Sequence, residues 1–450
     1  MLRLLPLLCA LALAWPSPAC AAPDVTAPPP GAQVDVDPAR RDAALSAVAW
    51  RSAYYGATEH LPPGLARWNR WRVERALRQQ VAASTGVLLV LLLLALSQRT
   101  RPTFEFGIKA THALPMMIQL GIYSWWAVWH LPVRWYAPLL LGQLVFGFLL
   151  DGLLGIVVSG RWRVGLAPAP VVLSAGLFAW FLAEGPWMST VVISAALASK
   201  HLLRRDGRHI FNPSAFGLSV AALCYLALPE STRWHGVVWE LDLAPGMVEL
   251  ILILALLAQT RVPVVLASMG ALLGMLAWGQ FAVVVADPLW AAPFLVIVLL
   301  LTDPATLPRT PAGRLLGGLT YALLLAPVTW FFVQTQGTDY WAKIVPVVLV
   351  NGLAPTLDRL GAHLPDRLSD LLAPARNRAH VALWFAVVAA LLLLQRPGGG
   401  TFDLRRHAQY GTVGVQYDVD PDTPAARCKA NPAWCRSFDL PAMLRARRGP

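Results

Sequence analysis

From residue 81 onward, long apolar runs alternate with short charged loops. The runs lie near residues 81–97, 110–131, 137–158, 165–183, 187–199, 211–228, 246–260, 263–285, 288–302, 315–333, 343–355 and 380–396. Crossing the hydrocarbon of a bilayer takes ~20 helical residues, so the pattern predicts an all-α integral membrane protein, a polytopic bundle of about 10–12 transmembrane helices. The runs at 187–199 and 343–355 are short and are expected to be half-helices or re-entrant segments.

The segments outside the apolar runs divide the chain further. Residues 1–21 combine Arg3, a short apolar core and the small residues Ala19-Cys20-Ala21, which is typical of a signal peptide. Residues 22–80 are expected to be exported: a Pro/Ala-rich stretch, then a basic amphipathic helix from Arg67 to Gln80 along the membrane surface. The multi-helix membrane domain then covers residues 81–396, and residues 397–450 form an exported tail.

The composition fits a membrane protein. Of 450 residues, 56% are hydrophobic and 14% are charged, against about 25% charged in soluble domains. The net charge is +12, but the cations between residues 81 and 396 lie in short loops between apolar runs and form no basic face interleaved with aromatic residues, so nucleic acid is excluded as a partner. The partner that this pattern predicts is the lipid bilayer.

Charge also predicts an orientation. If residue 22 lies outside, the basic loops at 99–109, 161–163, 200–208, 261, 309–314 and 359–378 share the inner side, as the positive-inside rule requires. This places the chain in a bacterial inner membrane with both termini in the periplasm. In that oxidising compartment Cys428 and Cys435 are expected to form a loop-closing disulfide.

One stretch combines cations with a helix break. In Ser199 to Leu218, the sequence is S-K-H-L-L-R-R-D-G-R-H-I-F-N-P-S-A-F-G-L, and its cations are Lys200, Arg204, Arg205 and Arg208. Proline lacks an N–H and crowds the preceding residue, so a helix is expected to be interrupted at Asn212. Two interpretations stay open: a binding site where the backbone is freed, or a basic loop followed by proline in the first turn of a new helix.

A second stretch repeats this arrangement later in the chain. An apolar run again leads into an Asx-Pro break, in the sequence Leu301-Thr302-Asp303-Pro304-Ala305-Thr306-Leu307-Pro308. Arg309 and Arg314 follow on the same predicted side. Paired interruptions in corresponding halves of a membrane protein indicate two structural repeats around a central site.

The two motifs together resemble those of the RnfD/NqrB superfamily of membrane proteins. The resemblance covers about residues 105–355 and rests on K-H-L-L-R-R-D-G-R-H-I-F-N-P-S-A-F-G-L and on L-L-L-T-D-P-A-T-L-P-R-T-P-A-G-R-L-L-G-G. It implies a membrane component of an electron-transport system that couples redox chemistry to ion movement. The expected partners are other membrane redox subunits or a soluble electron donor.

The resemblance also implies a flavin, with one departure. The family attaches FMN to a Thr in a motif like D-x-x-S-G-A-T, whereas the corresponding stretch, Trp239 to Glu249, contains no Ser or Thr. Covalent FMN is therefore not expected, and what remains is a non-covalent FMN or riboflavin. Its candidate ligands are Asn212, Asp303, Thr302 and Thr306, because an amide can both donate to and accept from the flavin ring, with Lys200, Arg204, Arg205 and Arg208 stabilising a reduced flavin.

Other functions stay open. A permease or channel with the same fold and no redox chemistry would use Asn212 and Asp303 for a solute, and Asp151 or Glu249 for protons. A scaffold would present the exported tails to a partner. No Cys cluster fits a zinc or iron–sulfur centre, so no metal site is predicted.

Overall fold

The computed structural model of the protein describes residues 63–98, 101–129, 131–179, 186–227, 247–277, 291–336 and 340–394. The predicted signal peptide, the Pro/Ala-rich stretch up to residue 62 and the tail with Cys428 and Cys435 lie outside these residues. So does most of the stretch from Trp239 to Glu249.

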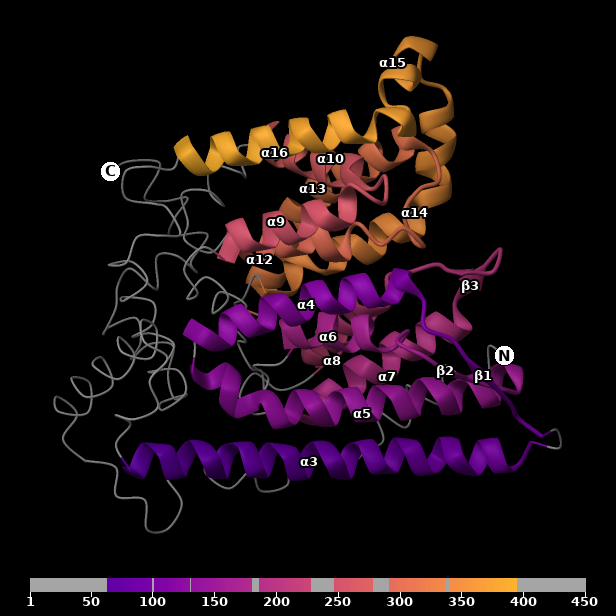
Figure 1. Ribbon diagram of the computed structural model, residues 1–450, viewed down its shortest axis with the longest axis vertical. Coiled ribbons are helices and arrows are strands. Elements are labelled where there is room, and N and C mark those ends of the chain that lie inside the picture. The colour runs from indigo at the N-terminus through magenta and orange to yellow at the C-terminus, as the bar shows by residue number, and fades with distance from the viewer. Residues whose placement is uncertain are drawn as a thin grey trace.

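Helices account for most of the described chain, and Figure 1 shows them running roughly parallel in two groups. The first group comprises α3 (Pro63–Leu96), α4 (Ala110–Trp129), α5 (Leu131–Ser159), α6 (Ala169–Ala179), α7 (Pro186–Leu202) and α8 (Pro213–Ala227). The second group comprises α9 (Met247–Gln259), α10 (Val265–Ala277), α12 (Ala291–Leu295), η3 (Val296–Leu300), α13 (Pro311–Gln336), η4 (Tyr340–Lys343), α14 (Val345–Ala362), α15 (Asp366–Leu371), η5 (Pro374–Arg376) and α16 (Asn377–Leu394). Contacts of α4 with α9 and of α8 with α14 join the groups.

Every apolar run of the sequence overlaps one of these helices. Four helical segments within the described residues are long and apolar enough to cross a membrane: Leu77–Leu96, Ala137–Ser159, Pro311–Phe332 and Trp341–Ala362. Shorter apolar helices are Ala169–Phe178, Pro213–Cys224, Met247–Gln259 and Val265–Ala277. Large apolar side chains face outward, as on α3, where Leu93 and Leu96 are 68% and 72% exposed. A surface of this kind is compatible with a membrane protein.

Two expected boundaries fall inside continuous helices. The segment from Arg67 to Gln80 and the apolar run after it form one helix, α3, with no break between Gln80 and Val81. The charged segment is therefore continuous with the first apolar run, because no proline or glycine interrupts the chain at that point. Similarly, α14 continues past Pro355 to Ala362, so the run at 343–355 belongs to a longer helix than its apolar residues indicate.

Two short strand pairs lie at one end of the helices and modify the all-α expectation. Strand β1 (Thr103–Phe106) pairs in parallel with β2 (Arg161–Val164), and β3 (Arg204–Arg205) pairs antiparallel with β4 (Arg208–His209). In Figure 1 the labelled β1, β2 and β3 all lie at the end of the bundle that also carries α15. Several of the predicted basic loops meet at this end, since Arg309 contacts Asp206 and Arg314 contacts the Pro263 carbonyl.

The core is apolar and shared by both groups of helices. Its largest fully buried side chains include Trp126, Trp341, Trp384 and Tyr321. Helices α10 and α13 approach each other closely, and a Cβ on Gly318 would lie 2.1 Å from the Ala267 carbonyl oxygen. Small residues permit this contact, which is typical of helix packing in membranes.

Candidate functional site

The two Asx-Pro motifs of the sequence meet in space at the end of the bundle that carries the strand pairs. The first motif enters this region through the β3–β4 hairpin. Its turn residues Asp206 and Gly207 have φ angles of 51° and 77°, as a type I′ turn requires. Arg205 and Arg208 flank the turn, and both are exposed.

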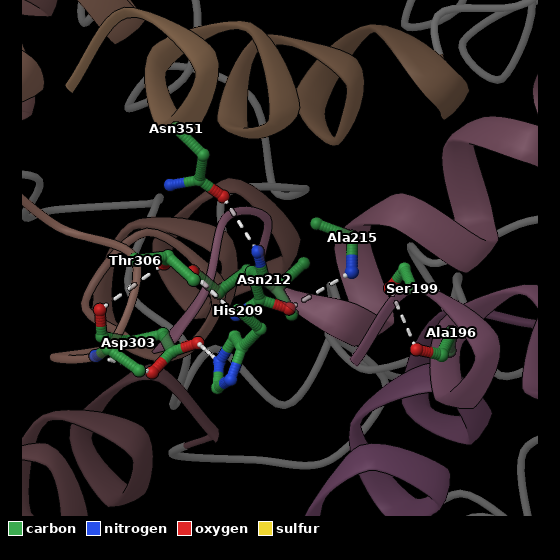
Figure 2. Close-up of polar contacts among 10 residues, drawn as sticks. Ala196, Ser199, His209, Asn212, Ala215, Asp303, Thr306 and Asn351 are labelled. Atoms are coloured by element: carbon green, nitrogen blue, oxygen red, sulfur yellow. Dashed lines mark hydrogen bonds and ion pairs between the residues drawn. The ribbon is translucent and has the colours of Figure 1, made fainter. Parts of the chain in front are cut away.

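Asn212 caps the helix that follows the hairpin. Its Oδ1 accepts a hydrogen bond of 3.0 Å from the backbone N–H of Ala215, and Pro213 occupies the first helical position of α8. An Asn cap followed by proline begins a helix, because the side chain replaces a missing acceptor and proline needs no N–H partner. Figure 2 shows this contact together with the bond from the backbone N–H of Asn212 to Asn351 Oδ1, at 2.8 Å.

The other end of the Asn212 amide contacts the second motif. Its Nδ2 donates to the Leu300 carbonyl at 2.9 Å. Leu300 ends the π-helix η3, and the last carbonyls of a helix have no partner within it. Side chains fill this role here: Ser268 Oγ donates to Ile297 O at 2.9 Å, and Thr302 Oγ1 donates to Val298 O at 2.6 Å.

Two of the predicted flavin ligands, Asn212 and Thr302, use their polar side-chain atoms for hydrogen bonds within the protein. Both polar atoms of the Asn212 amide have protein partners, and Asn212 is only 6% exposed. Thr302 is likewise buried and bonded to its own helix. The geometry therefore favours the interpretation in which the Asn-Pro break starts a helix and joins two segments.

Asp303 fixes the second motif and ties it to the first. Its Oδ1 accepts from the backbone N–H of Ala305 at 3.0 Å, which forms the turn after η3. Its Oδ2 lies 3.0 Å from Nε2 of His209, a residue 94 positions earlier in the chain (Figure 2). Thr306 Oγ1 donates to the Asp303 carbonyl at 3.3 Å, so Thr306 stabilises the same turn.

A cleft of about 530 Å³ opens where the two motifs and α14 come together. Four arginines line it, Arg205 and Arg208 from the hairpin, Arg309 from the second motif and Arg359 from α14. Other lining residues are Asp206, His209, Ile210, Ala305, Thr306, Leu307, Thr310, Asn351, Ala354, Pro355 and Asp358. The cleft thus carries four guanidinium groups against two carboxylates.

The two carboxylates of the cleft already have donors. Asp206 Oδ2 pairs with Arg309 Nη2 at 2.9 Å. Asp358 accepts from the backbone N–H groups of Arg309 and Thr310 and from Thr310 Oγ1, at 2.7–2.9 Å. Among the described residues no ion pair involves Arg205, Arg208 or Arg359. The field in the cleft is therefore positive, and the cleft is suited to an anion.

The structure divides the predicted cation cluster. Lys200 does not reach the cleft, because its Nζ lies 3.1 Å from Asp151 Oδ1 in α5. His201 Nε2 contacts the same carboxylate oxygen at 2.9 Å, so Asp151 holds two partners inside the bundle. Arg204 is exposed on the hairpin and donates to the Gly207 carbonyl. Only Arg205 and Arg208 of the predicted four line the cleft.

Asn351 is the site residue that sequence reasoning missed. It is fully buried in α14, lines the cleft, and its Oδ1 is held by the Asn212 N–H. Its Nδ2 has no partner among the described residues. The available signal was a lone Asn within the apolar run 343–355, since polar residues inside membrane helices are expensive to keep there.

No group of three or more His, Cys, Asp or Glu side chains within the described ranges has the arrangement of a metal site. Comparison of the chain with protein-family models and with curated proteins finds no match.

Proposed function

We propose that the protein is a multi-pass membrane component of an electron-transport system and holds a flavin non-covalently where its two Asx-Pro motifs meet. The observation that carries this proposal is the cleft between the motifs, where Arg205, Arg208 and Arg359 have no ion pair among the described residues. Arginine side chains beside a flavin stabilise the negative charge that the ring gains on reduction.

Two further features support the proposal. The motifs that resemble those of the RnfD/NqrB superfamily contact one another through His209 and Asp303, although 94 residues separate them. The missing hydroxyl between Trp239 and Glu249 leaves a non-covalent site as the way in which this chain would hold a flavin. Thr306 and the cleft arginines take the place of Asn212 as the proposed contacts.

The wider architecture belongs to the same proposal. About 10–12 membrane helices, arranged as two repeats with interrupted helices, would place both motifs at the same membrane face. The concentration of arginine there would make this the cytoplasmic face of a bacterial inner membrane, with both termini in the periplasm. A soluble electron donor or a neighbouring redox protein would then reach the cleft from the cytoplasm.

The test is the visible spectrum of protein purified in detergent, before and after acid precipitation. A flavin spectrum that dithionite bleaches and acid releases into the supernatant is the expected result. The variant Arg208→Gln should lower the flavin content. The control Arg163→Gln should retain the flavin, because Arg163 is an exposed residue of strand β2 that pairs with Glu105. Colour retained in the pellet would mean covalent attachment, and colourless protein in good yield would reject the flavin.

A second candidate is a permease that uses the same fold without redox chemistry. The observation that favours it is the buried Asp151, which contacts both Lys200 and His201 within the bundle. Buried ionisable groups in membrane helices commonly mark ion pathways. Colourless protein that moves protons in vesicles, and loses this activity in Asp151→Asn, would support the permease.

A further inference from the structure

The wall of the cleft contains a buried side chain, Asn351, whose amide donor has no acceptor among the described residues. Asn351 is 0% exposed, and the Asn212 N–H fixes its amide orientation by donating to Oδ1. This leaves Nδ2, a donor, without a partner among the described residues, and Figure 2 shows it turned away from Asn212. A buried donor without an acceptor is costly, so a ligand oxygen that reached Nδ2 would remove that cost.

The charged groups of the cleft specify what kind of acceptor fits. The carboxylates of Asp206 and Asp358 are satisfied by protein donors, whereas Arg205, Arg208 and Arg359 have no ion pair among the described residues. Guanidinium groups offer pairs of parallel N–H donors, which match the oxygens of a phosphate. Three arginines carry more positive charge than a single carboxylate ligand would balance.

We propose that this cleft binds the phosphate group of a phosphomonoester, with Arg205, Arg208 and Arg359 at the phosphate oxygens and Asn351 Nδ2 as a further donor. The cleft, at about 530 Å³, has the volume of a small-molecule site. The assignment of the ligand as FMN, as opposed to riboflavin, rests on the proposed flavin function. The phosphate site itself does not.

The experiment titrates delipidated, detergent-purified protein with FMN, riboflavin and inorganic phosphate, and follows binding by calorimetry. FMN should bind at least about tenfold more tightly than riboflavin, because a charge-assisted phosphate contact is lost in riboflavin. Inorganic phosphate should compete with FMN. The double variant Arg208→Gln/Arg359→Gln should weaken FMN and phosphate binding, and its loss of FMN affinity should exceed its loss of riboflavin affinity.

Two further variants make the test specific. Asn351→Asp keeps the oxygen that accepts from Asn212 but replaces the free donor with an acceptor, so it should weaken phosphate binding in folded protein. Arg163→Gln removes a positive charge from the same end of the bundle, outside the cleft, and should bind FMN like the parent. Equal loss in Arg163→Gln and in Arg208→Gln would overturn the site in favour of a general charge effect.

The outcomes separate this inference from the proposed function. Equal affinity for FMN and riboflavin, with an equal loss of both in the arginine variants, overturns the phosphate site and leaves the flavin function standing. Arginine-dependent phosphate binding without any flavin binding supports the site and rejects the flavin function. Competition by phosphatidic acid, with no binding of FMN, supports the site and identifies a lipid headgroup as the source of the phosphate. No effect of phosphate in any form overturns the proposal.

Discussion

The side-chain amide of Asn212 donates to the carbonyl of Leu300 at 2.9 Å, across 88 residues of sequence. Through its Oδ1 the same amide caps α8, and through its backbone N–H Asn212 also holds Asn351. One residue thereby connects the start of α8, the end of η3 and the middle of α14. The Asn-Pro break is thus a joint between segments, which explains why a polar side chain is buried there.

Asn212→Ala is expected to destabilise the protein by about 2 kcal/mol, since it removes a helix cap and leaves a buried carbonyl without a donor. Thermal unfolding in detergent would measure this. Asn212→Asp is the matched control: it retains the acceptor that caps α8 but cannot donate to Leu300. An unchanged melting temperature in Asn212→Asp would show that the Leu300 contact contributes nothing.

Two adjacent glycines in α13 should respond oppositely to alanine. In Gly318→Ala the new Cβ would lie 2.1 Å from the Ala267 oxygen, so α10 and α13 must separate, at a cost of about 1–3 kcal/mol. In Gly317→Ala the nearest atom is 3.6 Å away, and the better helix propensity of alanine should leave stability equal or raised. Equal melting temperatures of the two variants would contradict the close packing of these helices.

The buried carboxylate of Asp151 should depend on its partners. Asp151→Asn leaves the Lys200 ammonium, whose side chain is only 20% exposed, without a counter-charge, and should cost on the order of 3 kcal/mol. Adding Lys200→Met should recover much of this loss, because no unpaired charge then remains. Thermal unfolding of the single and double variants would measure both the loss and the recovery of stability. A double variant less stable than Asp151→Asn would contradict the pairing.

The contact between His209 and Asp303 should be energetically coupled. A double-mutant cycle of His209→Ala and Asp303→Ala is expected to give about 1 kcal/mol, because both side chains are mostly shielded from solvent, with 23% and 19% exposed. The cycle cancels the separate loss of the Asp303 turn. The Arg309–Asp206 pair, with 62% and 65% exposed, is the control, and its coupling should be smaller. Equal coupling in the two pairs would argue against a specific link between the motifs.

Local features of the chain were predictable because local physics decides them. The apolar runs predicted the helices, since the backbone groups of a segment in lipid must form their hydrogen bonds within that segment. Asn212-Pro213 indicates the start of α8, whereas the β3–β4 hairpin before it was not predicted. Local hydropathy did not give the helix ends, because the charged segment Arg67 to Gln80 and Pro355 lie inside helices that extend beyond the apolar runs.

By itself, therefore, the sequence determined that the chain forms apolar helices with basic loops and two helix breaks, because periodicity, proline and capping act over a few residues. Only the tertiary structure decided which polar groups meet. It paired Lys200 with Asp151 and bonded Asn212 to Leu300 and to Asn351, which brings Asn351 into one cleft with Arg208. Such contacts join segments from 49 to 139 residues apart, and no local pattern specifies them.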